Sequence, residues 1–165
     1  MDYSSYITEG RGRCDLSLLL RDPKVFANVI EEMTQPFVSS SVDAVAALDA
    51  LGFVFGTAVA QKLGVGLILV RKEGKISVER DSLRFTDYSG TEKGFEITKG
   101  VVKAGQRILV VDEWSETGAQ LRAAAILLER VGAMVVGISC FNIDKPVLSD
   151  QELQKYKLHS VNKSL

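Results

Sequence analysis

The sequence is poor in histidine and cysteine, and this scarcity excludes several kinds of site. The single histidine, His159, lies near the C-terminus, so a histidine triad or a metal site of several histidines is not expected. The two cysteines, Cys14 and Cys140, lie far apart and lack the spacing of a metal site or of a disulfide framework. We expect Cys140, which stands in an apolar run, to be a buried thiol. This cysteine usage is typical of a reducing compartment.

Long apolar runs and an excess of charge of one sign are also missing. No stretch is long enough to cross a membrane, and residues 1–5 lack the basic and apolar regions of a signal peptide. The net charge is −1 and the pI is near 5.9, which implies no broad basic face and makes nucleic acid a poor partner. We therefore expect a cytoplasmic protein that binds neither membranes nor nucleic acids.

The order of apolar and turn-forming segments predicts an α/β domain. The chain has 165 residues, enough for one domain with a substantial core. Asp22 and Pro23 are typical of a helix start, and Gly64 is typical of a helix end. The patterns predict helices at 23–35, 53–63, 117 to near 132 and 151–155, and strands at 42–48, 66–70, 108–111, 134–141 and 158–161. Strands that alternate with helices indicate a parallel sheet covered by helices.

Residues 76–100 break this alternation. Short strands are predicted at 76–79 and 95–97, and the residues between them, 81–94, are polar and include Gly90. A long polar segment inside a compact domain is typical of a mobile lid or of a disordered loop. We expect an antiparallel pair of strands with a mobile tip.

The most informative stretch is residues 108–120, an apolar strand followed by two acids and a helix start. Such a strand is typical of one buried on both faces, so we expect Asp112 and Glu113 at the carboxyl edge of the sheet, where open α/β folds bind ligands. Residues 117–119, Thr-Gly-Ala, then form a helix N-terminus whose free N–H groups favour a phosphate. This combination suggests a sugar phosphate with the carboxylates on its hydroxyls. The spacing alone also fits an ordinary loop with solvated acids.

Two clusters of cations accompany this stretch. Arg71, Lys72 and Lys75 follow the second predicted strand and are expected at the same edge, where they could meet a phosphate instead of solvent alone. Arg11 and Arg13 are separated by one glycine and could contact an anion or a polar ring. A solvated loop is the simpler interpretation of this second pair.

Residues 108–120 resemble the phosphoribosyl diphosphate signature of type I phosphoribosyltransferases, in which an apolar strand, two acids and Thr-Gly follow one another. Further blocks are similar to the adenine phosphoribosyltransferase branch, namely residues 15–17, 22–23, 51–56, 63–65, 71–75, 87–88 and 95–97. The resemblance implies a Rossmann-like parallel sheet flanked by helices. It also implies a single domain at 1–165, with a small N-terminal hood at about 1–22 and a flexible loop at about 76–98.

The resemblance implies a role for each matching residue. Asp112 and Glu113 would bind the ribose hydroxyls, and Asp87 would correspond to the catalytic acid of the flexible loop. The residues that would hold the diphosphate and the 5-phosphate are Arg71, Lys72, Lys75, Ser115, Glu116, Thr117, Gly118, Ala119 and Gln120. The residues that would meet the base are Trp114, Arg13 and Cys14. Mg²⁺ would be carried on oxygens of the substrate instead of in a protein metal site, and the protein would form a homodimer.

Several residues depart from the usual pattern of the branch and leave two functions open. Ala50 and Leu51 stand where the branch has a serine and an arginine that helps to bind diphosphate. Glu116 replaces a small residue of the phosphate loop, so we expect its carboxylate to point outward or to pair with a cation. One hypothesis is an enzyme that transfers ribose 5-phosphate from 5-phospho-α-D-ribose 1-diphosphate to a purine or purine-like base and releases diphosphate. The alternative is a catalytically weak or inactive regulatory protein that binds a nucleotide or phosphoribosyl diphosphate.

Overall fold

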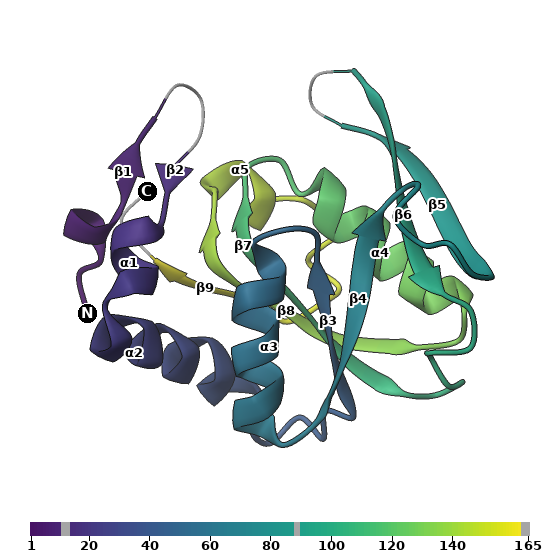
Figure 1. Ribbon diagram of the computed structural model, residues 1–165, viewed down its shortest axis with the longest axis horizontal. Coiled ribbons are helices and arrows are strands. Elements are labelled where there is room, and N and C mark those ends of the chain that lie inside the picture. Colours follow the sequence, from purple (N-terminus) through teal and green to yellow (C-terminus); the bar gives the residue numbers. More distant parts are fainter. Residues whose placement is uncertain (11–13, 88–89, 163–165) are drawn as a thin grey trace.

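A seven-stranded sheet forms the centre of the protein, with strand order β5-β6-β4-β3-β7-β8-β9 (Figure 1). The computed structural model describes residues 1–10, 14–87 and 90–162. The strands of this sheet are β3 (Ala44–Leu48), β4 (Gly66–Lys72), β5 (Arg80–Thr86), β6 (Glu92–Thr98), β7 (Arg107–Ser115), β8 (Met134–Ile143) and β9 (Leu158–Asn162). Strands β4, β3, β7, β8 and β9 pair in parallel, whereas β5 and β6 form an antiparallel hairpin on β4. The predicted Rossmann-like parallel sheet flanked by helices is confirmed.

Helices cover both faces of the sheet. The helices are α1 (Ser17–Arg21), α2 (Pro23–Thr34), α3 (Gly52–Leu63), α4 (Ala119–Arg130) and α5 (Lys145–Leu148). Figure 1 shows α2 and α3 on one face and α4 on the other. The N-terminal segment adds the 3-10 helix η1 (Ser4–Tyr6) and a small hairpin of β1 (Thr8–Glu9) and β2 (Cys14–Asp15). Within the described ranges, no helix has the length and apolar character needed to span a membrane.

Side chains of β7 alternate between two buried layers, as expected for a strand covered on both faces. Ile108 and Val110 join the layer under α4, whereas Leu109 and Val111 join the layer under α2 and α3. All four side chains are fully buried. Cys140 on the neighbouring strand β8 is also fully buried, which confirms the prediction for this thiol.

Helix α3 lies unusually close to the sheet because two glycines face it. A Cβ atom at Gly56 would lie 2.4 Å from the Cβ of Ala47 on β3. A Cβ atom at Gly52 would lie 2.6 Å from Oδ1 of Asp112 on β7. Both distances are too short for a real contact, so only glycine lets the helix sit this close. The helix start thus forms one wall around Asp112.

Local signals set the helix ends as the sequence predicted. The Asp22 carboxylate accepts hydrogen bonds from the N–H groups of Lys24 and Val25, at 2.9 and 3.1 Å, and so caps α2. Helix α3 ends at Gly64, which adopts a left-handed conformation with φ of 69°. Both predicted boundaries are confirmed.

One strand of the antiparallel pair was predicted at the wrong residues, whereas the pairing itself and the strand at 95–97, which is part of β6, are confirmed. Residues 76–79 are not a strand, and the supposedly polar segment 81–94 instead contributes most of β5 and the start of β6. The reason is that Leu83 and Phe85 alternate with polar residues and pack against the core on the α4 side. Phe85 also contacts Phe95 of β6, with ring centroids 5.1 Å apart. This period-two pattern is that of a half-buried strand.

Strand β4 buries Ile68 and Val70, whereas Leu67 and Leu69 remain 37% and 40% exposed. Two other expectations need correction. Strand β7 continues through both acids to Ser115, since it keeps its pairing with β8 to that residue. Residues 151–155 form turns, not a helix, and the helical turn lies earlier, at α5, where Pro146 occupies the first turn.

We predict that Gly56→Ala destabilises the fold by about 1–3 kcal/mol, because the added methyl group would push α3 away from Ala47. Urea denaturation measures the change. Gly66→Ala is the matched control, since a Cβ atom there would meet no other atom within 4 Å. Equal stability of the two variants would contradict the close packing of α3.

Candidate active site

A cavity of about 720 Å³ opens at the carboxyl ends of β3, β4 and β7. Its walls come from the N-terminal segment, the loop after β3, the β5–β6 hairpin and the turn between β7 and α4. The lining residues are Cys14, Leu16, Asp49, Ala50, Leu51, Lys72, Glu73, Phe85, Glu92, Lys93, Gly94, Phe95, Asp112, Glu113, Trp114, Ser115, Glu116, Thr117, Gly118, Ala119 and Gln120. Most of the residues expected to bind a sugar phosphate therefore lie around one space.

The two acids of β7 differ in their surroundings. Asp112 is 5% exposed and lies against the start of α3, where Gly52 leaves room for its carboxylate. Its Oδ1 accepts a hydrogen bond of 2.9 Å from the backbone N–H of Glu113. The Glu113 side chain is half-buried and lines the cavity. A buried and a more open carboxylate thus stand side by side at the edge of the sheet.

Burial raises the pKa of Asp112 well above its usual range, and the neighbouring Glu113 carboxyl raises it further. The N–H group of Glu113 and the ammonium group of Lys72 act in the opposite direction but do not outweigh burial. Asp112 therefore holds a proton more readily than an exposed aspartate. A cation placed next to this pair would favour the charged form.

The turn between β7 and α4 presents backbone N–H groups to the cavity. Gly118 adopts a left-handed conformation with φ of 75° and stands at the N-cap of α4. Within the described ranges, no backbone N–H of residues 116–120 donates to another backbone group. Glu116 and Thr117 are exposed at the rim. Free amides at the N-terminus of a twelve-residue helix favour an anion such as a phosphate.

The segment after β8 supports this turn from behind. A Cβ atom at Gly118 would lie 2.7 Å from Cδ1 of Leu153 and 3.1 Å from Cγ1 of Val147. Arg122 in the first part of α4 pairs with Asp150 of the same segment. The turn is therefore packed tightly against α5 and the residues that follow it, and its backbone shape depends on that packing.

Among the predicted cations, the structure brings Lys72 to the cavity but not Arg71 or Lys75. The guanidinium group of Arg71 instead pairs with Asp49, with 3.2 Å between Nε and Oδ2. The side chain of Lys75 is exposed, and its backbone N–H donates to the buried carboxylate of Glu96 at 2.6 Å.

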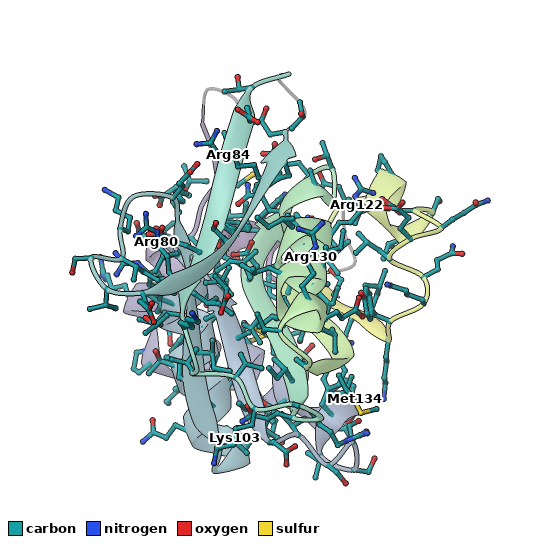
Figure 2. All side chains as sticks on the ribbon, turned by 90° about the vertical axis from the view of Figure 1, so that its right-hand side faces the viewer. Arg80, Arg84, Lys103, Arg122, Arg130 and Met134 are labelled. Atoms are coloured by element: carbon teal, nitrogen blue, oxygen red, sulfur yellow. The ribbon has the colours of Figure 1, made fainter. Side chains whose placement is uncertain are left out.

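Three arginines farther from the cavity, Arg80, Arg84 and Arg122, pair with acids. Figure 2 shows Arg80 and Arg84 on the β5–β6 hairpin, and Arg122 and Arg130 along α4. Arg80 and Arg84 pair with Glu96 and Glu73, each at 2.9 Å. Lys72 and Lys93, by contrast, are among the residues that line the cavity, so a ligand bound there would meet them.

Glu96 holds the turn after β4 in place. Burial opposes the charged form, but hydrogen bonds from the backbone N–H groups of residues 74–76 and the charge of Arg80 keep the pKa of Glu96 below its usual value. Sequence reasoning did not identify this residue, because its partners lie twenty or so residues away along the chain. Glu96 fixes the shape of the turn next to Lys72.

Of the residues predicted for the flexible loop and the N-terminal hood, the structure places only some in the cavity wall. Asp87 closes the β5–β6 hairpin, where it accepts a hydrogen bond of 3.2 Å from the N–H of Thr91 and pairs with Lys93. Asp87 is not among the residues that line the cavity, whereas Lys93, which sequence reasoning missed, is. Cys14 lines the cavity as expected, and Arg13 lies outside the described residues.

Trp114 combines a polar contact with a place in the cavity wall. Its indole Nε1 donates to Oδ1 of Asp144 at 3.1 Å. Its ring lies against Phe141, with centroids 6.4 Å apart and the planes tilted by 54°. The side chain is half-buried and forms part of the cavity wall.

Carboxylates near the cavity do not form a ready-made metal site. Among the residues described, no group of three or more histidine, cysteine or acidic side chains could hold a metal ion. Asp112, Glu113 and Glu116 nevertheless offer oxygen atoms, the ligands that Mg²⁺ prefers.

A sequence model of the phosphoribosyl transferase domain matches residues 18–160, which is most of the chain. The chain belongs to the phosphoribosyltransferase family. The adenine phosphoribosyltransferase of Methylobacterium sp. (strain 4-46) is 38% identical over 134 residues, which are 81% of this chain and 73% of that protein. The enzyme of the same name from Rhodopirellula baltica is 36% identical over 148 residues, 89% of this chain and 71% of its own.

Solved structures of this family share the fold. An adenine phosphoribosyltransferase from Thermoanaerobacter pseudethanolicus has a TM-score of 0.88 and 32% identity, and the match covers 96% of this chain and 95% of that one. One from Rhodothermus marinus has the same TM-score of 0.88 at 24% identity, over 96% and 94% of the two chains, and so supports the fold alone. The family predicted from residues 108–120 is confirmed. The alternative of a regulatory protein without turnover finds no support in these relatives, whose names are those of enzymes.

We predict that Asp112→Asn becomes more stable than the wild type as the pH rises from about 4 to about 8. The folded state raises the pKa of Asp112, so the stability that its protonated form contributes is complete at low pH and is lost as the pH rises through the folded value. Asparagine does not titrate and escapes this loss, while its oxygen can still accept the Glu113 N–H.

Urea denaturation of both proteins across this pH range measures the difference in the free energy of unfolding. If the difference in unfolding free energy between the two proteins does not change with pH, then burial does not raise the pKa of the Asp112 carboxyl.

Proposed function

We propose that the protein transfers ribose 5-phosphate from 5-phospho-α-D-ribose 1-diphosphate to a purine base and releases diphosphate. The observation that carries the proposal is the set of groups that share one cavity. The paired acids on β7, the turn at the start of α4 and the lysines on β4 and β6 all line it. The acids suit the ribose hydroxyls, the amides of the turn suit the 5-phosphate, and the lysines suit the diphosphate. Membership of the phosphoribosyltransferase family supports the same reaction.

The acids and the turn would hold the sugar phosphate. Asp112 and Glu113 would accept hydrogen bonds from the two ribose hydroxyls, which fixes the ring at the edge of the sheet. The N–H groups of residues 116–120, with the Thr117 hydroxyl, would bind the 5-phosphate. The exposed Glu116 would point its carboxylate away from the phosphate, since the turn bonds its ligand through backbone groups.

The lysines would act on the leaving group. The bond between ribose C1 and the diphosphate oxygen breaks, and its electron pair leaves with diphosphate. A base nitrogen then forms the new bond to C1 and releases its proton to the solvent. Lys72 and Lys93 would stabilise the charge that gathers on the diphosphate, and the acids on β7 would stabilise the positive charge that develops on the ribose. Leu51 lines the cavity where the adenine phosphoribosyltransferase branch usually has an arginine. Lys72 and Lys93 would therefore carry a larger share of the diphosphate binding than they would beside that arginine.

Mg²⁺ fits this arrangement as an ion held mainly by oxygens of the substrate. The open carboxylate of Glu113 and the buried carboxylate of Asp112 would complete its ligands from the protein side. When bound, the ion neutralises part of the diphosphate charge. Asp112 would then be charged, because a nearby cation favours the carboxylate form over the acid.

The base would lie against Trp114, opposite Cys14 and Leu16 of the N-terminal segment. A flat indole ring is well suited to stack on a purine. Adenine is the first candidate, because the relatives with 36–38% identity are named adenine phosphoribosyltransferases. The proposed closure of the β5–β6 hairpin over the site would exclude water during transfer.

We also propose a homodimer formed through α3 and β4. Val54 on α3 and Leu67 and Leu69 on β4 are 43%, 37% and 40% exposed, and the two elements pack together, so large apolar side chains are accessible to a second copy of the chain there. Sedimentation velocity tests this, since a monomer at micromolar concentration would contradict it. The single-domain organisation at 1–165 and the cytoplasmic location remain predictions from the sequence.

The activity is tested by incubating the protein with 5-phospho-α-D-ribose 1-diphosphate, Mg²⁺ and a panel of purines, with diphosphate release as the measurement. We expect release that depends on one of the purines, and formation of the matching nucleoside 5′-monophosphate. An Asp112→Asn, Glu113→Gln double variant serves as the inactive control. Tight nucleotide binding without turnover of any base would favour the regulatory alternative.

We predict that Lys72→Ala raises KM for the diphosphate substrate by about 10- to 100-fold, because it removes a hydrogen bond to a charged group. Lys75→Ala should have a much smaller effect, since its side chain lies outside the cavity wall. Steady-state kinetics at saturating base distinguish the two variants. Equal effects would mean that the turn after β4 moves when substrate binds.

A further inference from the structure

We infer that Asp144 is a positioning residue for base binding, which fixes the indole ring of Trp114 as one wall of the base subsite. The inference rests on the proposed function, because it takes Trp114 to be the residue that meets the base. Asp144 itself is not part of the cavity wall. It acts through the ring.

Asp144 holds Trp114 by two routes. Its side-chain Oδ1 accepts the indole N–H at 3.1 Å, which fixes the orientation of the ring. Its backbone N–H donates to the carbonyl oxygen of Ser115 at 2.9 Å, which ties the end of β8 to the residue after Trp114. The carboxylate and the strand that carries the tryptophan are therefore locked together.

The carboxylate is in turn held by a hydrogen-bonded pair of buried amides. Asp144 Oδ1 also accepts from Nδ2 of Asn142 at 2.7 Å. The side-chain Oδ1 of Asn142 accepts from Nδ2 of Asn162 on β9 at 3.0 Å. Both asparagines are almost fully buried, at 1% and 4% exposure. Buried polar groups with satisfied partners specify one arrangement, so this chain defines where the carboxylate points.

The contacts leave one part of the indole for the ligand. Its N–H edge is engaged by Asp144, and Phe141 packs against it from within the core. The remaining surface forms part of the wall of the cavity, which Cys14 and Leu16 of the N-terminal segment also line. With its only donor satisfied, the indole offers a flat apolar surface and no hydrogen bond. Trp114 would therefore supply affinity for a flat bicyclic base without selecting among its substituents.

The test compares Asp144→Ala with Asp144→Asn. Trp114 is the single tryptophan of the chain, so the intrinsic fluorescence reports on this ring alone. We expect Asp144→Ala to shift the emission to the red, to increase quenching by acrylamide, and to raise KM for the purine by about 3- to 10-fold, with kcat and KM for the diphosphate substrate nearly unchanged. Asp144→Asn keeps the acceptor oxygen and should restore most of the base affinity.

Trp114→Phe provides the matched background, because phenylalanine keeps a ring but lacks the N–H. If Asp144 acts through Trp114, adding Asp144→Ala to Trp114→Phe should change KM for the purine by less than about twofold. Unchanged fluorescence in Asp144→Ala, an unchanged KM for the purine, or full additivity with Trp114→Phe would each overturn the inference. The fluorescence measurement needs no substrate, so it tests the contact between Asp144 and Trp114 independently of turnover. Failure of the proposed function would appear separately, as a wild-type protein that turns over no purine.

Discussion

The close approach of α3 to the sheet is the constraint on which the site depends. Gly56 sets the helix against Ala47, and Gly52 places its first turn next to the carboxylate of Asp112. This packing buries Asp112 while Glu113 stays accessible, and it places the loop after β3 on the wall of the same cavity. A helix held farther away would open the base of the cavity to water, and the paired acids would lose their difference in environment.

Residues behind the cavity hold its loops through contacts that span the fold. Glu96 on β6 fixes the turn beside Lys72, and Asp144 fixes the ring of Trp114. The segment after α5 packs beneath Gly118. Each ligand-facing group is thus shaped by a partner on another strand or helix. A precise site of this kind loses binding when a partner is changed, even though the partner never touches the ligand.

The sequence predicted those parts of the fold and site whose cause is local. The cap at Asp22, the end of α3 at Gly64 and the acids beside the turn at 116–120 all follow from neighbouring residues. Strand β5 was missed because its apolar residues, Leu83 and Phe85, are few and are half-buried against α4. The side-chain pairs could not be predicted, because Arg71 with Asp49 and Trp114 with Asp144 join residues 22 and 30 positions apart.

A crystal structure of the protein with the nucleoside 5′-monophosphate product is the most direct test of the claim that one cavity binds phosphate, ribose and base. The account predicts the phosphate on the amides of residues 116–120, the ribose hydroxyls on Asp112 and Glu113, and the base against Trp114. A nucleotide bound with its phosphate elsewhere, or with its base away from Trp114, would contradict it.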